Sequence, residues 1–349
     1  MEIVSGKKEN FFKFLDKLNK KDKIAILSHI DLDGITSAII INEILKSKKL
    51  KYKTIKFINY QPGVFKEIIP ELEKKKINKI FIADISVDSD YEGYKELKER
   101  FKIFVVDHHP FENEDIDNMI KTESSDCATF SLFQLTKEYF KEEKINLEKL
   151  KELVCATMIC EFSYNKKENL QYIQSLYPEI TPENAYENSS LGDICKKISS
   201  TLICFNNKEK KVFNMVLKGK LNKMEKYDQI IKKAIDLEIK KFEKEEEFFP
   251  EKKIHIYFEN SKFKIASTIS TILSMKKPDE TFVFFSENLN DLNMIKVSSR
   301  NQNGKEEVNL LMKKAIQGLE HATGGGHLKA AGANFMKKDL QKFKENLLK

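Results

Sequence analysis

Acidic and imidazole side chains gather in three short segments of this sequence. The segments read "SHIDLDG", "ADIS" and "DHHP", and they carry His29, Asp31, Asp33, Asp84, Asp107, His108 and His109. Two adjacent histidines are unusual in a chain of 349 residues that has only six. Carboxylate and imidazole ligands without cysteine suit Mn²⁺, Mg²⁺, Fe²⁺ or Zn²⁺ rather than a thiolate site.

Each segment follows, or ends, a run of residues that is typical of a buried strand. The runs cover residues 23–28, 79–84 and 102–107, and a helical pattern over residues 34–47 follows the first. Strands that alternate with helices predict a parallel α/β sheet, in which ligands bind beyond the carboxyl ends of the strands. The three segments should therefore meet at one edge of the sheet.

A turn with a helix-capping aspartate is the simplest explanation of "DLDG" taken alone. Three converging segments favour a metal site instead, because so many acidic and imidazole groups would otherwise repel one another or stay unsatisfied. The number of ligands exceeds what one ion needs. Two ions roughly 3.5 to 4 Å apart with a bridging carboxylate would suit phosphoryl hydrolysis.

The length of the chain favours more than one domain. We expect a first α/β domain over residues 1–200, a highly charged helical linker over 201–250 and a smaller α/β domain over 251–349. The substrate would bind in a cleft between the two α/β domains. A net charge of +7, from 61 Lys+Arg and 54 Asp+Glu, is weak evidence for an anionic partner because the chain is rich in lysine throughout.

The sequence shows no apolar run of membrane-spanning length and no secretory leader. Its five cysteines form no CxxC pair and are expected to be buried thiols. These features predict a cytoplasmic protein that does not bind membranes.

The three segments resemble the first three motifs of the DHH phosphoesterase superfamily, which includes RecJ-type nucleases, oligoribonucleases and cyclic-dinucleotide phosphodiesterases. The C-terminal "GGGHLKAAGANF" resembles the signature of the DHH-associated C-terminal domain, and "VSSRN" resembles the arginine-bearing strand before it. The resemblance covers nearly the whole chain and implies a DHH catalytic domain followed by a substrate-binding domain.

The resemblance also implies roles for individual residues. One metal would be held by His29, Asp31 and Asp84, and the other by Asp33, Asp84 and His108, with Asp84 bridging. His109 would face the substrate phosphate or the leaving group, and Asp107 would orient a histidine. Two Mn²⁺ ions are the expected cofactor, with Mg²⁺ as the alternative.

One position departs from the family pattern. Members usually supply a fourth-motif aspartate, and here Glu161 in "VCATMICEFSYN" stands at that place. Glu161 would then be an altered ligand; Asp193 is a substitute further along the chain, and loss of one tight metal site is the alternative.

The second domain carries its own candidate residues for substrate binding. Successive glycines let a phosphate approach backbone N–H groups, His327 can donate to a phosphate oxygen, and Arg300 offers a bidentate fork. We expect a glycine-rich loop there, and the candidates are Arg300, Gly324, Gly325, Gly326 and His327. No role is assigned to His255 or His321, and Ser125 and Thr129 are either helix caps or substrate contacts.

The expected function is metal-dependent hydrolysis of single-stranded or short oligonucleotides, RNA or DNA, or of linear or cyclic dinucleotides, to nucleoside 5′-monophosphates. The first alternative is a replication-associated scaffold with weakened catalysis. The second is a phosphatase that acts on 3′-phosphoadenosine 5′-phosphate or polyphosphate. The sequence leaves oligomerisation and protein partners open.

Overall fold

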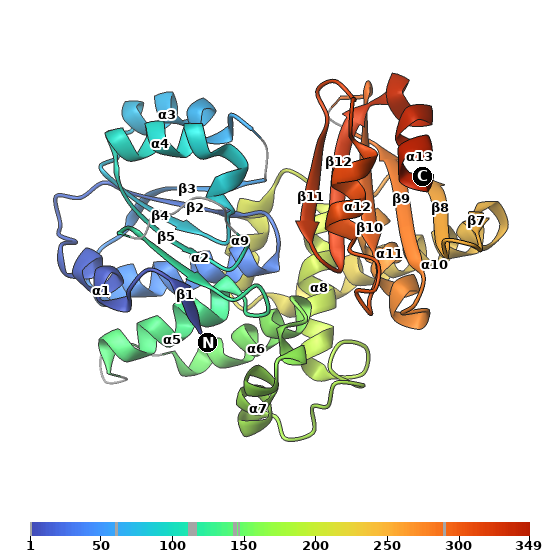
Figure 1. Ribbon diagram of the computed structural model, residues 1–349. Coiled ribbons are helices and arrows are strands. Elements are labelled where there is room, and N and C mark those ends of the chain that lie inside the picture. Colours follow the sequence, from blue (N-terminus) through green and yellow to red (C-terminus); the bar gives the residue numbers. More distant parts are fainter. Residues whose placement is uncertain (1, 60–61, 111–116, 142–144, 146, 289–290) are drawn as a thin grey trace. The chain divides into compact units, whose positions relative to one another are not determined.

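The structure is a computed structural model that describes residues 2–59, 62–110, 117–141, 145, 147–288 and 291–349. The chain packs as two compact units, Met1–Asp228 and Gln229–Lys349, and each unit has its own sheet (Figure 1). The borders predicted at residues 200 and 250 stay predictions.

The first unit is built on a six-stranded sheet with the order β1-β6-β5-β4-β2-β3. Its strands from β6 to β3 are parallel, and β1 pairs antiparallel with β6 at one edge. The strands are β1 (Ile3–Ser5), β2 (Ile24–His29), β3 (Tyr52–Ile58), β4 (Lys79–Ala83), β5 (Lys102–Asp107) and β6 (Met119–Thr122). The predicted parallel α/β sheet is therefore confirmed.

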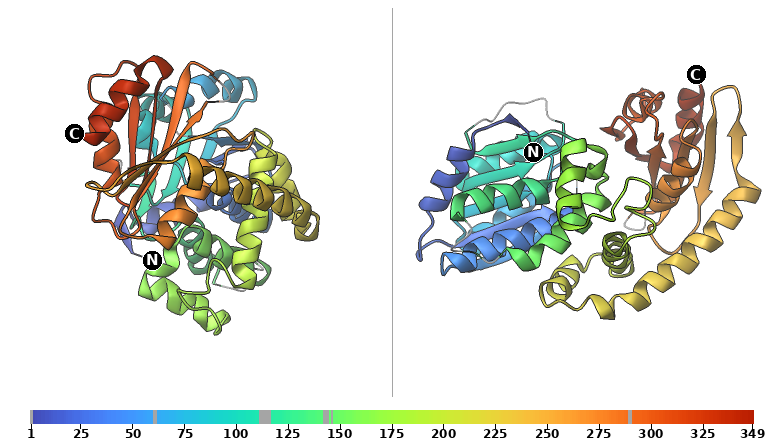
Figure 2. Two further views of the ribbon diagram at one scale, coloured as in Figure 1. Left: turned by 90° about the vertical axis from the view of Figure 1, so that its right-hand side faces the viewer. Right: turned by 90° about the horizontal axis from the view of Figure 1, so that it is seen from below.

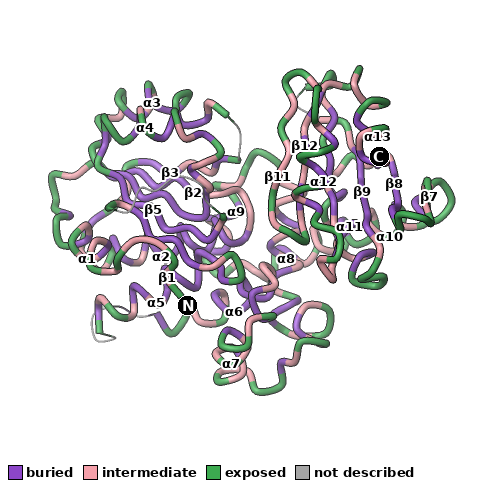
Figure 3. The backbone as a smooth tube through the Cα atoms, viewed as in Figure 1, coloured by how far each residue is buried: buried purple, intermediate pink, exposed green. Residues whose placement is uncertain are grey.

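Helices cover both faces of this sheet, so its central strands are buried at nearly every position (Figure 3). Alternate residues of β2 enter different cores: Ile24 and Ile26 pack with α1, α2 and α5, whereas Ala25 and Leu27 pack with α3 and α4. Helices α3 and α4 lie on one face (Figure 1), and the helices of the other face lie in front of the sheet in the view from below (Figure 2).

The helices that begin in this unit connect the strands or extend the second face. They are α1 (Lys8–Asp16), α2 (Leu32–Ser47), α3 (Val64–Lys74), α4 (Tyr91–Arg100), α5 (Ala128–Phe140), α6 (Lys151–Cys160), α7 (Lys167–Leu176), α8 (Ser190–Cys204), α9 (Glu209–Leu217) and α10 (Glu225–Glu245), which continues into the second unit.

The second unit has a six-stranded sheet with the order β11-β12-β10-β9-β8-β7, in which only β8 and β9 pair in parallel. Helices α12 and α13 pack on one face, and α11 contacts β9 and β10. The elements are β7 (Glu247–Phe249), β8 (Ile254–Glu259), α11 (Ala266–Lys276), β9 (Thr281–Glu287), β10 (Met294–Arg300), α12 (Val308–Ala315), β11 (Thr323–His327), β12 (Ala330–Met336) and α13 (Leu340–Leu348).

The expectation of a glycine-rich loop at "TGGGH" is wrong, because these residues form the edge strand β11. Gly324 to Gly326 pair with β12, so backbone hydrogen bonding holds the segment extended despite its glycines. Gly326 has a φ of +137°, and a Cβ there would lie 2.6 Å from the carbonyl oxygen of Ala330. Glycine is therefore required at that position for the close approach of β12.

Candidate metal centre

The candidate site lies where β2, β4 and β5 end. In the parallel sheet Ser28 pairs with Ala83, and Ala83 pairs with Val106. The next residue along each of the three strands therefore lies beside the next residue of its neighbour. Those residues are His29, Asp84 and Asp107. The predicted convergence of three segments at one sheet edge is what the strands produce.

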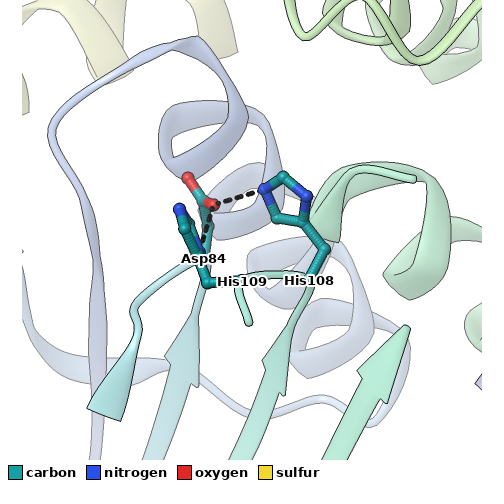
Figure 4. Close-up of side chains that lie close together, drawn as sticks. All are labelled: Asp84, His108 and His109. Atoms are coloured by element: carbon teal, nitrogen blue, oxygen red, sulfur yellow. Dashed lines mark ion pairs between the residues drawn. The ribbon is translucent and has the colours of Figure 1, made fainter. Parts of the chain in front are cut away.

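Two groups of metal-competent side chains share Asp84. The first contains His29, Asp31 and Asp84, and the second contains Asp84, His108 and His109; within each group the donor atoms lie within 4.8 Å of one another. Figure 4 shows both imidazoles of the second group directed at the carboxylate. His108 Nε2 is 3.4 Å and His109 Nδ1 is 4.0 Å from Asp84 Oδ1, and His29 Nδ1 is 3.6 Å from Asp84 Oδ2.

Asp84 is held in an uncommon backbone conformation. Its φ is +57°, in the left-handed region that non-glycine residues adopt rarely and aspartate tolerates better than most. Its N–H donates to the carbonyl of Val106 over 3.0 Å, which ties the residue to β5. Burial, and then the nearby Asp33 and Asp31, raise the pKa of Asp84 well above its usual value. A cation would relieve this crowding of carboxylates.

The turn between β2 and α2 positions the other half of the first group. Asp31 is the N-cap of α2, where one oxygen accepts from the Gly34 N–H over 3.0 Å and the other lies 2.7 Å from His29 Nδ1. A Cβ on Gly34 would lie 2.1 Å from the carbonyl oxygen of His29. The capping turn and the metal-competent group are thus the same structure.

Asp33 lies beside the second group but faces another helix. Its Oδ2 is 3.8 Å from His108 Nε2, yet its two oxygens accept from the N–H groups of Ala128 and Thr129 over 2.8 and 2.7 Å. Asp33 belongs to neither group of donor atoms found among the described residues. It holds the N-terminus of α5 to α2 at the edge of the site.

The N-cap of α5 is Cys127, whose sulfur accepts from the Phe130 N–H. Thr129 donates its hydroxyl to the Asp33 carbonyl over 3.0 Å, and the exposed Ser125 contacts Glu123. Neither of the two predicted candidates caps α5 with its side chain.

Glu161 ends α6 and lies within the electrostatic reach of the site. Burial, and then the charge of Asp31, raise the pKa of Glu161 well above its usual value. It is outside both groups of donor atoms among the described residues. Asp193 is exposed on α8 and pairs with Lys196 over 3.2 Å, so the structure gives it no part in this cluster.

Lys121 is a functional candidate that was not predicted from the sequence. It is on β6, fully buried, and its Nζ donates to Asp107 Oδ2 over 2.5 Å and to the His109 carbonyl over 3.2 Å. Asp107 Oδ1 lies 2.8 Å from His109 Nδ1. No local pattern signals this Lys121–Asp107–His109 chain, because Lys121 lies in the short mixed segment "NMIKT".

Donor chemistry and burial together fit divalent cations at the two groups. Carboxylate and imidazole are ligands that Mn²⁺ and Mg²⁺ accept, and buried carboxylates that repel one another are stabilised by a bound cation. Asp84 touches both groups, as a bridging ligand would.

The predicted substrate residues of the second unit lie at one end of its sheet. Arg300 pairs with Ala330 and Ala330 with His327, so these residues share a sheet face. Arg300 Nε donates to Thr271 Oγ1 over 2.9 Å, and its Nη2 donates to Ser267 Oγ over 3.0 Å. The hydroxyls of α11 thereby orient the guanidinium.

The two remaining histidines have different surroundings. His255 is buried on β8, where its Nε2 lies 2.6 Å from Glu280 and its Nδ1 contacts Glu246. Its ring stacks on Phe282 with centroids 4.5 Å apart. His321 has a φ of +52° in the turn before β11. His255 therefore has a packing role, and His321 belongs to neither metal-competent group.

Comparison with known proteins identifies two domains. Residues 23–160 match the DHH family, N-terminal domain, and residues 251–349 match the DHHA1 domain. No curated protein matches the chain. None of the helices in the described part of the chain has the length and apolarity of a membrane span.

Solved structures share the fold at low identity. The exonuclease RecJ bound to manganese is 14% identical, with a TM-score of 0.68 over 97% of this chain and 92% of that chain. An exopolyphosphatase-related protein from Bacteroides fragilis is 17% identical, with a TM-score of 0.59 over 98% and 95%. CDC45 from Entamoeba histolytica is 12% identical, with a TM-score of 0.54 over 97% of each chain.

Proposed function

The chain belongs to the DHH phosphoesterase superfamily and ends in a DHHA1 domain, and from this we propose that it is a metal-dependent phosphodiesterase. Its substrates would be single-stranded or short oligonucleotides, or dinucleotides, which it would hydrolyse to nucleoside 5′-monophosphates. The observation that carries this proposal is Asp84, a buried carboxylate shared by two groups of metal-competent side chains.

His29, Asp31 and Asp84 would hold one ion, and Asp84 and His108 the other, with Asp33 and Glu161 completing or tuning the second position. The fold similarity to a RecJ bound to manganese supports Mn²⁺, with Mg²⁺ as the alternative. Such ions, when bound, polarise phosphate oxygens and lower the pKa of a coordinated water toward neutrality.

His109 would move a proton at the scissile phosphate. Burial lowers the pKa of His109, which favours the neutral imidazole. In that form Nδ1 donates its hydrogen to Asp107, and Nε2 would be the nitrogen that exchanges a proton with the substrate. Lys121 keeps Asp107 ionised, since burial raises the pKa of this carboxyl but His109 and Lys121 together bring it well below its usual value. Asp107 is thus a positioning residue and His109 the proposed catalytic one.

The second unit would bind the phosphate or base of the terminal nucleotide. Arg300 offers a planar fork of donors, and His327 on β11 lies at the same level of the sheet. Gly324, Gly325 and Gly326 bring the backbone of β11 close to any group placed there, because none of them carries a Cβ.

The experiment is a panel of substrates offered to the Mn²⁺-loaded protein. It contains end-labelled RNA and DNA of graded length, linear and cyclic dinucleotides, 3′-phosphoadenosine 5′-phosphate and polyphosphate. We expect release of nucleoside 5′-monophosphate from the oligonucleotides, and none from an Asp84→Ala variant. Cleavage of polyphosphate or 3′-phosphoadenosine 5′-phosphate alone would replace the proposed substrate class, and no cleavage of any substrate would refute a hydrolase.

A further inference from the structure

Five lysines surround one surface pocket of the first unit, and the metal centre uses none of them. Lys208, Lys210, Lys211, Lys218 and Lys220 line this pocket of about 510 Å³ together with two uncharged residues. They come from both ends of α9 and from the turns that flank it. We call this feature the lysine pocket.

The segment around the lysine pocket has a much higher ratio of basic to acidic residues than the whole chain. Residues 208–223 contain six lysines and a single acidic residue, Glu209, whereas the whole chain has 61 Lys+Arg against 54 Asp+Glu. Among the described residues, no carboxylate lines the pocket, and none of its five lysines has a carboxylate partner within 4.0 Å. These like charges repel one another until an anion neutralises them.

A second lysine-lined pocket of the same chain differs in that a carboxylate lies among its lysines. Its volume is about 500 Å³, and Lys23, Lys53 and Lys74 to Lys76 line it together with Glu71. Glu71 pairs with Lys75 over 2.6 Å and also contacts Lys56. Lys23 precedes β2 and Lys53 lies near the start of β3, so this pocket is at the amino ends of the strands, opposite to the metal centre.

Helix α9 is held firmly beneath the lysine pocket. Its apolar face, with Val212, Phe213 and Val216, is buried, so the lysines lie on the solvent side. The ring of Phe213 lies 5.8 Å from that of Phe57 on β3. Phe57 pairs with Ser28, the residue before the proposed ligand His29. The pocket is thus carried by a helix that packs on the strand beside β2.

Aromatic rings lie among the lysines. Lys211 Nζ is 4.0 Å from the centroid of Phe205, which lies 4.8 Å from the ring of Tyr227. Lys226 in turn lies 4.8 Å from the centroid of Tyr227. Half-buried rings interleaved with cations are features of surfaces that bind single-stranded nucleic acid, where the cations contact phosphates and the rings contact bases.

We propose that the lysine pocket binds the phosphate backbone of a single-stranded oligonucleotide, several nucleotides away from the bond that is hydrolysed. The proposal rests on the proposed function, and it predicts that strands longer than a dinucleotide bind more tightly than a dinucleotide does. Short substrates would fill the metal centre without reaching the pocket, so only longer strands would gain affinity from it.

The test compares two variants of equal charge. One is the quadruple change Lys208→Gln, Lys211→Gln, Lys218→Gln and Lys220→Gln, and the control is Lys23→Gln, Lys53→Gln, Lys74→Gln and Lys76→Gln in the second pocket. Binding of a fluorescent 20-nucleotide single strand is measured by anisotropy in EDTA, which prevents hydrolysis, across a range of salt concentrations. Circular dichroism checks that both variants are folded.

Loss of four phosphate contacts should reduce the slope of log affinity against log salt by about 3, since each contact on a single strand contributes roughly 0.7. The affinity at 0.1 M salt should fall on the order of 100-fold in the first variant and far less in the control. Equal losses in the two variants would overturn the proposal. So would an unchanged affinity for the strand combined with lost binding to phosphatidylserine vesicles, which would identify a membrane surface as the partner.

Hydrolysis of a dinucleotide with Mn²⁺ separates this proposal from the proposed function. The lysine-pocket variant should retain the parent rate on the dinucleotide and lose efficiency only on the long strand. If the parent protein hydrolyses nothing but binds the strand through this pocket, the function fails and the binding site stands. If hydrolysis is normal but the strand binds both variants equally well, the binding site fails and the function stands.

Discussion

At the scale of single residues, the buried Lys121–Asp107 pair is what fixes His109. Lys121→Met would remove the partner of a fully buried carboxylate and should destabilise the first unit by about 3 to 5 kcal/mol. Because His109 would then lose its orientation, kcat on an oligonucleotide should also fall about 10- to 100-fold. Urea unfolding and steady-state rates measure the two effects.

The double variant Lys121→Met with Asp107→Asn tells positioning from mere support of the fold. Removing both charges should restore most of the free energy of unfolding, because no buried charge is left unpaired. The kcat should stay low, and its dependence on pH should differ from that of the parent. Recovery of kcat together with stability would show that Lys121 only supports the fold.

Glu259 makes the stability of the second unit depend on pH. Burial, and then the charge of Glu238, raise the pKa of Glu259 to about 8 from an ordinary value of 4.5. Between these two pKa values the carboxyl of Glu259 is protonated in the folded chain and ionised in the unfolded chain. Because ionisation favours the unfolded chain, the free energy of unfolding falls as the pH rises toward 8.

Between pH 5.5 and 7.5 the parent should thus lose about 2 kcal/mol of unfolding free energy relative to Glu259→Gln. Urea titrations followed by circular dichroism give this difference at each pH. Glu287, which is exposed and pairs with Lys337, supplies the control: Glu287→Gln should follow the parent. If the difference in unfolding free energy between Glu259→Gln and the parent were the same at each pH, the prediction of a buried, protonated carboxyl would be wrong.

At the scale of elements, the junction of β2 and α2 leaves no room for a side chain at Gly34. Gly34→Ala would place a Cβ 2.1 Å from the His29 carbonyl oxygen, so the junction must shift and carry His29 and Asp31 with it. We expect at least a 10-fold loss of Mn²⁺ affinity by calorimetry. Gly325→Ala, which meets nothing within 4 Å, is the matched control and should bind Mn²⁺ as the parent does.

Helix α11 orients the arginine at the end of β10. Thr271→Val combined with Ser267→Ala removes both hydroxyl acceptors of Arg300 and should raise KM about 3- to 10-fold with little change in kcat. Thr271→Ser, which keeps the acceptor, should restore part of the affinity. An unchanged KM in the double variant would show that Arg300 needs no such support.

Regular apolar patterns made the first sheet predictable from the sequence. The runs of β2, β4 and β5 are buried on both faces, and the acidic and imidazole groups follow directly at their carboxyl ends. Strands β1 and β6 were not predicted, since they have only three and four residues and no alternation long enough to recognise. Strand β11 was missed because its glycines favour loops, and only pairing with β12 makes it extended.

Only the residues of the site that lie in local sequence motifs could be predicted. His29, Asp31 and Asp84, and His108 with Asp84, came together as strand order required. The role of Lys121 could not be predicted, because it depends on the pairing of β5 with β6, which no local sequence pattern indicates. The approach of Thr129 to Asp33 spans 96 residues of sequence and is likewise set by tertiary packing.

At the scale of the whole molecule, the chain separates its proposed tasks between two independently cored units. The first carries both groups of metal-competent side chains, and the second carries Arg300 and His327. The family relationship extends over both units, since the DHH domain lies in the first and the DHHA1 domain in the second.

The proposed metal-dependent hydrolysis is tested most directly by the rate at which metal-stripped protein, refilled with Mn²⁺, releases nucleoside 5′-monophosphate from a short single-stranded RNA or DNA. Asp84→Asn is compared with the parent under the same conditions, because it preserves shape and removes the shared carboxylate. We expect hydrolysis that requires the metal and is about 100-fold slower in the variant. Equal rates with and without Mn²⁺, or equal rates in parent and variant, would contradict this expectation.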